Sequence, residues 1–148
     1  MLTDVYNKRI LELAANIPRL ERLPTPDATA KAHSRLCGST VTVDLSMDGD
    51  VVTAFGHEVK ACALGQASSA IMAQHVVGST AQELRQVREL ARAILKENAD
   101  PPDGKWGDLA VLAPVRDYKA RHASTLLTFD AVVDAIDQIE ARRQAGAA

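Results

Sequence analysis

The chain has 148 residues, of which 47% are hydrophobic and 24% charged, so it is long enough to bury one core and has the composition of a globular domain. Its 17 basic and 19 acidic side chains give a formal net charge of −2, which argues against nucleic acid as a partner. No segment approaches the ~20 apolar residues that cross a bilayer, and the N-terminus does not read as a secretory signal. We therefore expect a cytoplasmic protein with no membrane partner, built as a single domain over residues 1–148 with a folded part from about residue 3 to 142 and a polar tail.

The N-terminal segment carries hydrophobic residues at intervals of three and four, which predicts a helix from Tyr6 to Ile17. Thr3 is placed to cap this helix, and Pro18 should end it. Between residues 18 and 36 the periodicity lapses and two further prolines appear, so we expect an extended connection there.

A run of alternating residues follows. Val41–Leu45 alternates β-branched or aliphatic residues with polar ones, which predicts a half-buried strand. Met47–Asp50 contains an Asp-Gly pair typical of a tight turn, and Val51–Phe55 reads as the returning strand. Gly56–Ala61 is expected to form a third strand, so the sequence predicts a three-stranded antiparallel meander.

The remainder of the chain has helical patterns. We expect a helix over Gly65–Val77 ended by Gly78, and a second helix that opens with a capping box at Thr80–Glu83. Later segments are a loop over 98–104, a short helix over 106–112, and a long C-terminal helix through 126–136 that fades after residue 143. Strands followed by helices indicate an α+β fold, with the N-terminal and C-terminal helices packed on one face of the meander.

Two cysteines, Cys37 and Cys62, are the strongest candidates for chemistry. Both lie at predicted element boundaries, and Gly38 lets the backbone pass close to whatever Cys37 holds. Cys62 precedes a helix, whose positive N-terminal end favours a thiolate that can bind metal or carry sulfur. The alternative is a pair of buried, inert cysteines, and the spacing of 25 residues does not decide between them.

The other functional motifs are weak or missing. None of the four histidines forms a metal-binding pair, although His122 opens a helix within a segment of cations and hydroxyl groups. The chain lacks a GxSxG elbow, a P-loop and a GxGxxG motif. Because no acid–base or nucleophilic constellation is complete, we do not expect a conventional enzyme.

Two segments resemble the NifU/IscU family of iron–sulfur cluster assembly scaffolds, most closely its SufU-like branch. Leu36-Cys37-Gly38-Ser39 before a strand is similar to the first-cysteine motif Leu-Cys-Gly-Asp, and residues 61–68, ACALGQAS, resemble the second motif GCAISQAS. Residues 76–112 resemble the SufU insertion. The resemblance implies a SufE/NifU-like fold for nearly the whole chain.

In this family three cysteines and an aspartate hold a [2Fe–2S] cluster or a zinc ion, and thiolates suit both metals. The resemblance therefore implies that Cys37 and Cys62 are metal ligands. Two family ligand positions are substituted: Ser39 replaces the aspartate, and Ser124 replaces the third cysteine in an ungapped alignment. A register shifted by two residues would instead place His122 at the third position.

The resemblance implies a scaffold that accepts iron, takes sulfur from a cysteine desulfurase and passes a [2Fe–2S] cluster to apo-protein acceptors. The alternatives are a zinc-binding or sulfur-relay partner of the desulfurase, and a structural adaptor that lost the metal. Two chains together would supply four thiolates, so a homodimer could bridge one cluster. Residues 112–116, LAPVR, resemble a chaperone-binding peptide of the IscU branch, but we favour an ordinary loop that closes onto the last helix, because so short a pattern matches by chance.

Overall fold

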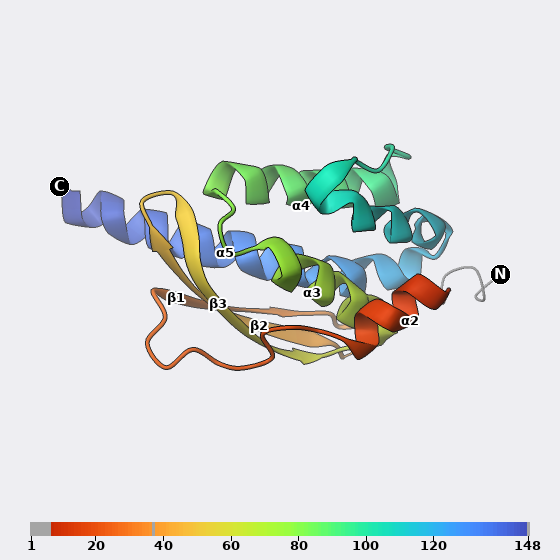
Figure 1. The fold of residues 1–148 in the computed structure, drawn as a ribbon, viewed down its shortest axis with the longest axis horizontal. Helices are drawn as coiled ribbons and strands as arrows, with labels where there is room; N and C mark the ends of the chain where they lie inside the picture. The colour runs from red at the N-terminus through yellow and green to blue at the C-terminus, as the bar shows by residue number, and fades with distance from the viewer. Residues whose placement is uncertain (1–6, 37, 148) are drawn as a thin grey trace.

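The computed structural model describes residues 7–36 and 38–147, so Cys37 and the predicted cap Thr3 lie outside the described part. A three-stranded antiparallel sheet carries helices on one face, while a long connection crosses the other face (Figure 1). The α+β fold with an antiparallel meander and helices packed on one face is therefore confirmed.

The sheet consists of β1 (Ala28–His33), β2 (Thr40–Asp48) and β3 (Val51–Lys60), in the order β1-β2-β3. Two strand assignments from the sequence are wrong. The expected strands over 51–55 and 56–61 are one continuous strand, because Gly56 pairs with Asp44 and does not interrupt the ladder. The missing third strand is β1, which lies in the predicted connection; its inward residues are small alanines, so the alternation is weak in the sequence.

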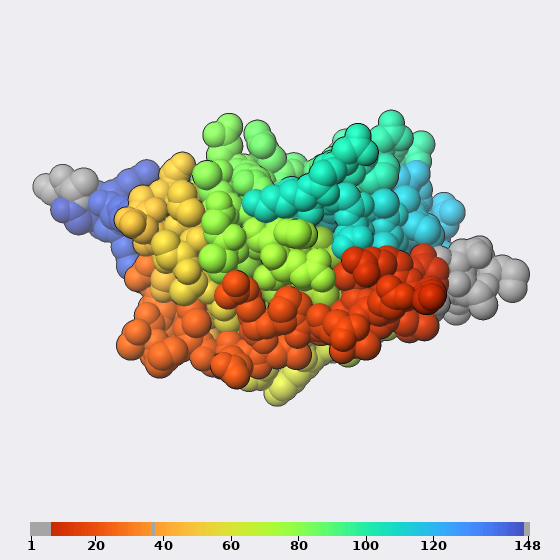
Figure 2. All heavy atoms as spheres, in the orientation of Figure 1, coloured from red at the N-terminus to blue at the C-terminus, as the bar shows by residue number. Residues whose placement is uncertain are grey.

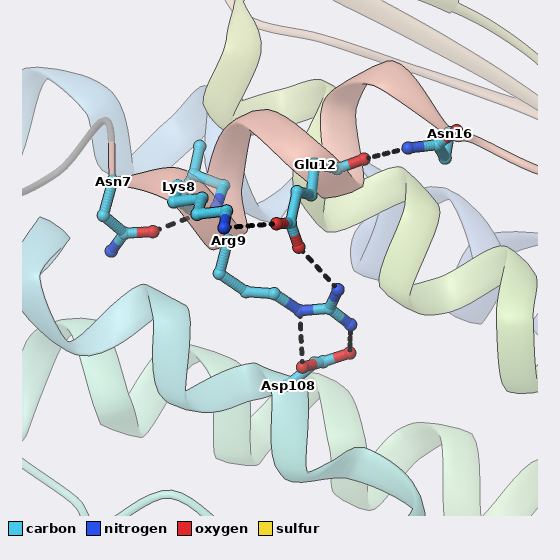
Figure 3. A network of polar contacts seen from close by, with 7 residues as sticks. Asn7, Lys8, Arg9, Glu12, Asn16 and Asp108 are labelled. Carbon is cyan, nitrogen blue, oxygen red and sulfur yellow. Dashed lines mark hydrogen bonds and ion pairs between the residues drawn. The ribbon is translucent and has the colours of Figure 1, made fainter.

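Helix α2 (Lys8–Ala15) is shorter than the predicted N-terminal helix. Asn7 is its N-cap, since the Asn7 side chain accepts a hydrogen bond of 3.0 Å from the Ile10 amide. Figure 3 shows how Arg9 connects α2 to a distant segment: its Nε and Nη2 donate to the two carboxylate oxygens of Asp108 at 3.2 and 2.6 Å. This bidentate pair ties α2 to the distant segment that contains Asp108.

Residues 16–27 form the connection that covers the outer face of the sheet. The main-chain carbonyl of Glu21 passes over Gly56 so closely that a Cβ there would lie 2.1 Å from this oxygen. The fully buried carboxylate of Asp44 accepts hydrogen bonds from Arg22, the Leu23 amide and Thr29. Burial alone would raise the pKa of Asp44, but these donors outweigh it and lower the pKa, so the carboxylate stays ionised and fastens the connection.

Two helices follow the sheet: α3 (Ala63–His75) and α4 (Ala81–Lys96). Gly78 has a positive φ of 91° just after α3, in line with its expected role as a helix stop. Thr80 caps α4 through a 3.1 Å hydrogen bond from the Glu83 amide, as the capping box predicts. The Glu83 carboxylate instead accepts from Trp106 at 2.8 Å and pairs with Lys105 at 2.9 Å, where the start of η1 lies over α3 and α4 (Figure 2).

The last elements are the 3₁₀ segments η1 (Gly104–Asp117) and η2 (Lys119–Arg121) and the helix α5 (His122–Ala147). The predicted short helix is thus longer and of the 3₁₀ type, and the predicted polar tail continues the last helix. Arg142 and Arg143 donate to main-chain carbonyls of Asp27 and Gly49, which supports this end of α5 against the sheet. α5 packs on β1, β2, α3 and α4, and among the described residues no helix is long and apolar enough to cross a membrane.

Candidate functional site

Cys62 lies between the end of β3 and the start of α3, where it is the N-cap residue with extended backbone angles (φ −68°, ψ 172°). Its thiol is partly exposed and is not in a disulfide. The Gln66 side chain donates a 2.8 Å hydrogen bond to the Ala61 carbonyl, and the Gln66 amide donates to the Cys62 carbonyl at 2.9 Å. These bonds fix the junction between strand and helix and so fix the backbone position from which the thiol projects.

Ser124, in the first turn of α5, faces this thiol. Its Oγ lies 3.7 Å from the Cys62 Sγ, and it donates a 3.1 Å hydrogen bond to the Arg121 carbonyl. Two thiolates on one tetrahedral metal, each bonded at about 2.3 Å, are separated by about 3.8 Å. The two side chains form a thiol–hydroxyl hydrogen bond, and their separation is also compatible with two ligand positions on one metal ion.

Gly65 makes this close approach of α3 to α5 possible. A Cβ at Gly65 would lie 2.8 Å from the Ala61 Cβ and 3.2 Å from the Ser124 carbonyl oxygen, both of which are too close. Ser68 and Ser69, farther along α3, are fully buried, so this small-residue segment serves helix packing.

The loop between β1 and β2 reaches the same end of the sheet. His33 pairs with Thr40, and Thr40 pairs with Lys60, two residues before Cys62. The Ser34 amide donates to the Ser39 carbonyl at 2.9 Å, and Gly38 has a positive φ of 70°. Ser39 is buried. Cys37 lies outside the described residues, so its role as a ligand stays a prediction.

His122 has a different environment from the one the shifted register implies. Its ring is buried, and its Nε2 lies 3.1 Å from the Val115 carbonyl and 3.0 Å from the Arg116 carbonyl. Because both partners are acceptors, Nε2 carries the proton and binds the end of η1. The contact with Cys62 belongs to Ser124, which favours the ungapped register and leaves the ligand role of His122 a prediction.

Within the described part of the chain, no group of three His, Cys, Asp or Glu side chains is arranged to hold a metal ion. The site therefore consists of one thiol, one hydroxyl group facing it, and the adjacent loop of residues 34–39. A neutral hydroxyl is a weaker ligand for iron or zinc than a thiolate. The donor set fits a thiolate-held metal only if Cys37 supplies a further sulfur.

Comparison with known proteins identifies the family of this chain. The family model of the NifU-like N terminal domain matches residues 5–125, most of the chain. The chain belongs to the NifU-like N-terminal domain family. This confirms the resemblance that the two cysteine motifs carry.

Two solved structures share this NifU-like fold, and a curated relative is similar in sequence. The crystal structure of a nitrogen-fixing NifU-like protein (N-terminal) from Brucella abortus is 62% identical, covers 94% of this chain and 96% of that one, and superposes with a TM-score of 0.91. A putative SUF-system scaffold, FiSufU of Fervidobacterium islandicum, has a TM-score of 0.81 at 21% identity, covering 88% and 96% of the two chains. The iron–sulfur cluster assembly scaffold protein IscU of Thermotoga maritima is 24% identical over 136 residues, 91% of this chain and 94% of that protein.

The segment that resembles a chaperone-binding peptide belongs to η1 in this NifU-like domain. Leu112 and Val115 are fully buried, and Arg116 donates to the carbonyls of Ile94 and Ala99 at 3.1 Å each. An extended peptide would have to expose both side chains and break these hydrogen bonds. The structure therefore favours the interpretation of this segment as an ordinary connection to the last helix.

Sequence reasoning missed the positioning roles of Gln66 and Gly65. The signal was present for Gln66, which matches the second cysteine motif within the first turn of α3, whereas Gly65 stands where that motif has a serine. Spacing along one segment cannot show that Ser124 is the residue these two bring against the thiol, because Cys62 and Ser124 are 62 positions apart and the chain between them folds through α4 and η1.

Proposed function

We propose that this NifU-like domain is an iron–sulfur cluster assembly scaffold that holds iron and sulfide, its cargo, with the thiolates of Cys37 and Cys62. The separation of 3.7 Å between Cys62 Sγ and Ser124 Oγ carries the proposal, because it matches two ligand positions on one metal. The similarity to iron–sulfur cluster assembly scaffolds of Thermotoga maritima and Fervidobacterium islandicum supports this function over a zinc-holding or sulfur-relay role.

The residues would divide the work by their chemistry. The thiolates bind iron and accept sulfur delivered by a cysteine desulfurase, because soft sulfur ligands suit both tasks. The first turn of α3 and the Gln66–Ala61 hydrogen bond hold the backbone that carries the Cys62 thiol. Apo-protein acceptors in the cytoplasm would receive the finished cluster, and the scaffold itself catalyses no bond-breaking reaction.

The missing third cysteine bears on how a cluster is held. A [2Fe–2S] centre ordinarily takes four ligands, and one chain offers two thiolates. We infer that two chains bridge one cluster with four thiolates, related by a two-fold axis. Size-exclusion chromatography of reconstituted protein should show cluster absorbance with the dimer. Absorbance that elutes only with monomer, at one cluster per chain, would contradict the bridge and favour His122 as a further ligand.

Replacement of each thiol tests the site. The Cys37→Ser and Cys62→Ser variants should lose most of their bound metal while circular dichroism shows an unchanged fold, since position 62 is partly exposed and its neighbour Ser124 is already a serine. Metal content would be measured on protein purified without oxygen. Stoichiometric metal in both variants would place the site elsewhere and defeat the proposal.

A further inference from the structure

A hollow of about 250 Å³ lies where α4 ends and α5 begins. In Figure 1 these two helix ends lie at the same end of the molecule as the start of α3. Its lining residues come from four elements and are Leu95, Lys96, Arg116, Lys119 and His122. The volume is several times the ~30 Å³ that one water molecule occupies, so a small molecule fits.

The charge of this hollow has one sign. Three of its lining residues, Lys96, Arg116 and Lys119, are cations, and none of the lining residues is acidic. Within the described part of the chain, neither lysine forms an ion pair, whereas Arg9, Arg22, Arg85 and Arg88 each pair with a carboxylate. Three cations from separate elements that converge on a concave surface concentrate a positive field there.

The central cation of the hollow is held rigidly. The Arg116 guanidinium donates through Nε to the Ile94 carbonyl and through Nη2 to the Ala99 carbonyl, and its Nη1 donates to the Asn98 side chain. The buried His122 holds the Arg116 carbonyl from the other side at 3.0 Å. A guanidinium has five N–H donors, so two donors of Arg116 remain for a ligand. The fold already fixes the position of the guanidinium that carries them.

We propose that this hollow binds a small polyvalent oxyanion, either a phosphate or a polycarboxylate. Both carry the oxygen acceptors and the negative charge that a fixed guanidinium and two ammonium groups recognise. The inference rests on the lining residues and their charges, and it does not depend on cluster assembly at Cys62.

Binding to metal-free protein tests the proposal by isothermal titration calorimetry with sodium phosphate and, separately, sodium citrate, at an ionic strength held constant with sodium chloride. Wild-type protein should bind one anion per chain. A Lys96→Ala/Lys119→Ala double variant should weaken this affinity at least tenfold; both lysines are exposed, so the fold should survive. The control Lys8→Ala/Lys31→Ala removes the same charge from exposed sites elsewhere and should bind like wild type.

Each outcome decides the proposal. Binding of phosphate alone or citrate alone identifies which oxyanion the site accepts. No saturable binding of either ion, or equal weakening in both double variants, overturns the inference. Saturable binding of poly-glutamate without binding of either small ion would also overturn it, because the surface would then recognise an acidic polypeptide.

Discussion

Restoration of a thiol at position 124 should strengthen metal binding sharply. In a Ser124→Cys variant the new sulfur would replace an oxygen that already lies 3.7 Å from the Cys62 sulfur. The Ser124 side chain is buried beside α3, and a cysteine is only slightly larger, so the packing should change little. Zinc is the simplest probe, since it has no redox chemistry and binds thiolates in tetrahedral geometry.

The size of the effect follows from the ligand count. Structural zinc sites with four ligands bind with an apparent free energy of about 10–16 kcal/mol, or about 3 kcal/mol per ligand. Since 1.4 kcal/mol corresponds to a factor of ten in affinity, one added thiolate should lower the zinc dissociation constant about 100-fold. The gain should vanish in a Ser124→Cys/Cys62→Ser double variant if the two positions share one metal.

Competition with a chromophoric chelator at pH 7.5 measures this dissociation constant. Ala123→Cys is the matched control, because residue 123 is exposed one position earlier on the same helix and adds a thiol that does not replace the Ser124 contact. An equal gain in both variants, or no gain in Ser124→Cys, would refute the assignment of position 124 as a ligand position.

Three further predictions concern the framework of the site. Asp44→Asn removes the charge from a buried carboxylate that accepts four hydrogen bonds, and should cost about 3 kcal/mol and lower Tm by about 10 °C in thermal unfolding, whereas the exposed Asp48→Asn should change little. Gly65→Ala should push α3 away from Ser124 and reduce metal affinity with little loss of helix content. The control Gly107→Ala should bind metal normally, because its Cβ would lie 3.8 Å from the Pro102 carbonyl oxygen. Equal metal affinities of the two variants would contradict the packing argument. Burial lowers the pKa of His57, although the hydrogen bond with the Pro18 carbonyl opposes the shift. Below about pH 6.5 the unfolded chain therefore binds more protons than the folded chain, so the free energy of unfolding should fall there in urea titrations. A His57→Phe variant that shows the same decline would exclude His57 as its cause.

Local sequence signals were sufficient for much of the fold. The alternation in β2, the Asp-Gly turn and the capping box at Thr80 depend on neighbouring residues, and the structure contains each of them. β1 was not predicted, because its inward positions are alanines and its stability comes from pairing with β2 rather than from its own pattern. The length of α5 was underestimated because its last turns are polar and are supported by contacts of Arg142 and Arg143 with distant carbonyls.

The candidate site was also only partly predictable from local sequence. Cys62 was identifiable from its motif and its place before a helix. The choice between Ser124 and His122 was not, because two registers of one short segment fit the sequence equally well. The contact of Ser124 with Cys62 and the hydrogen bonds of His122 to η1 depend on how α5 packs, which no local pattern records.

The central claim is that this domain assembles a cluster although it lacks the third cysteine. The most direct measurement is anaerobic reconstitution with ferrous iron, cysteine, a cysteine desulfurase and dithiothreitol, which reduces the transferred persulfide sulfur to sulfide. Transfer to an apo-ferredoxin follows. We expect visible thiolate-to-iron absorption on the wild-type chain, its loss in Cys62→Ser, and a reconstituted ferredoxin after transfer. Bound zinc without such absorption, or ferredoxin that fills equally well with Cys62→Ser, would contradict the account.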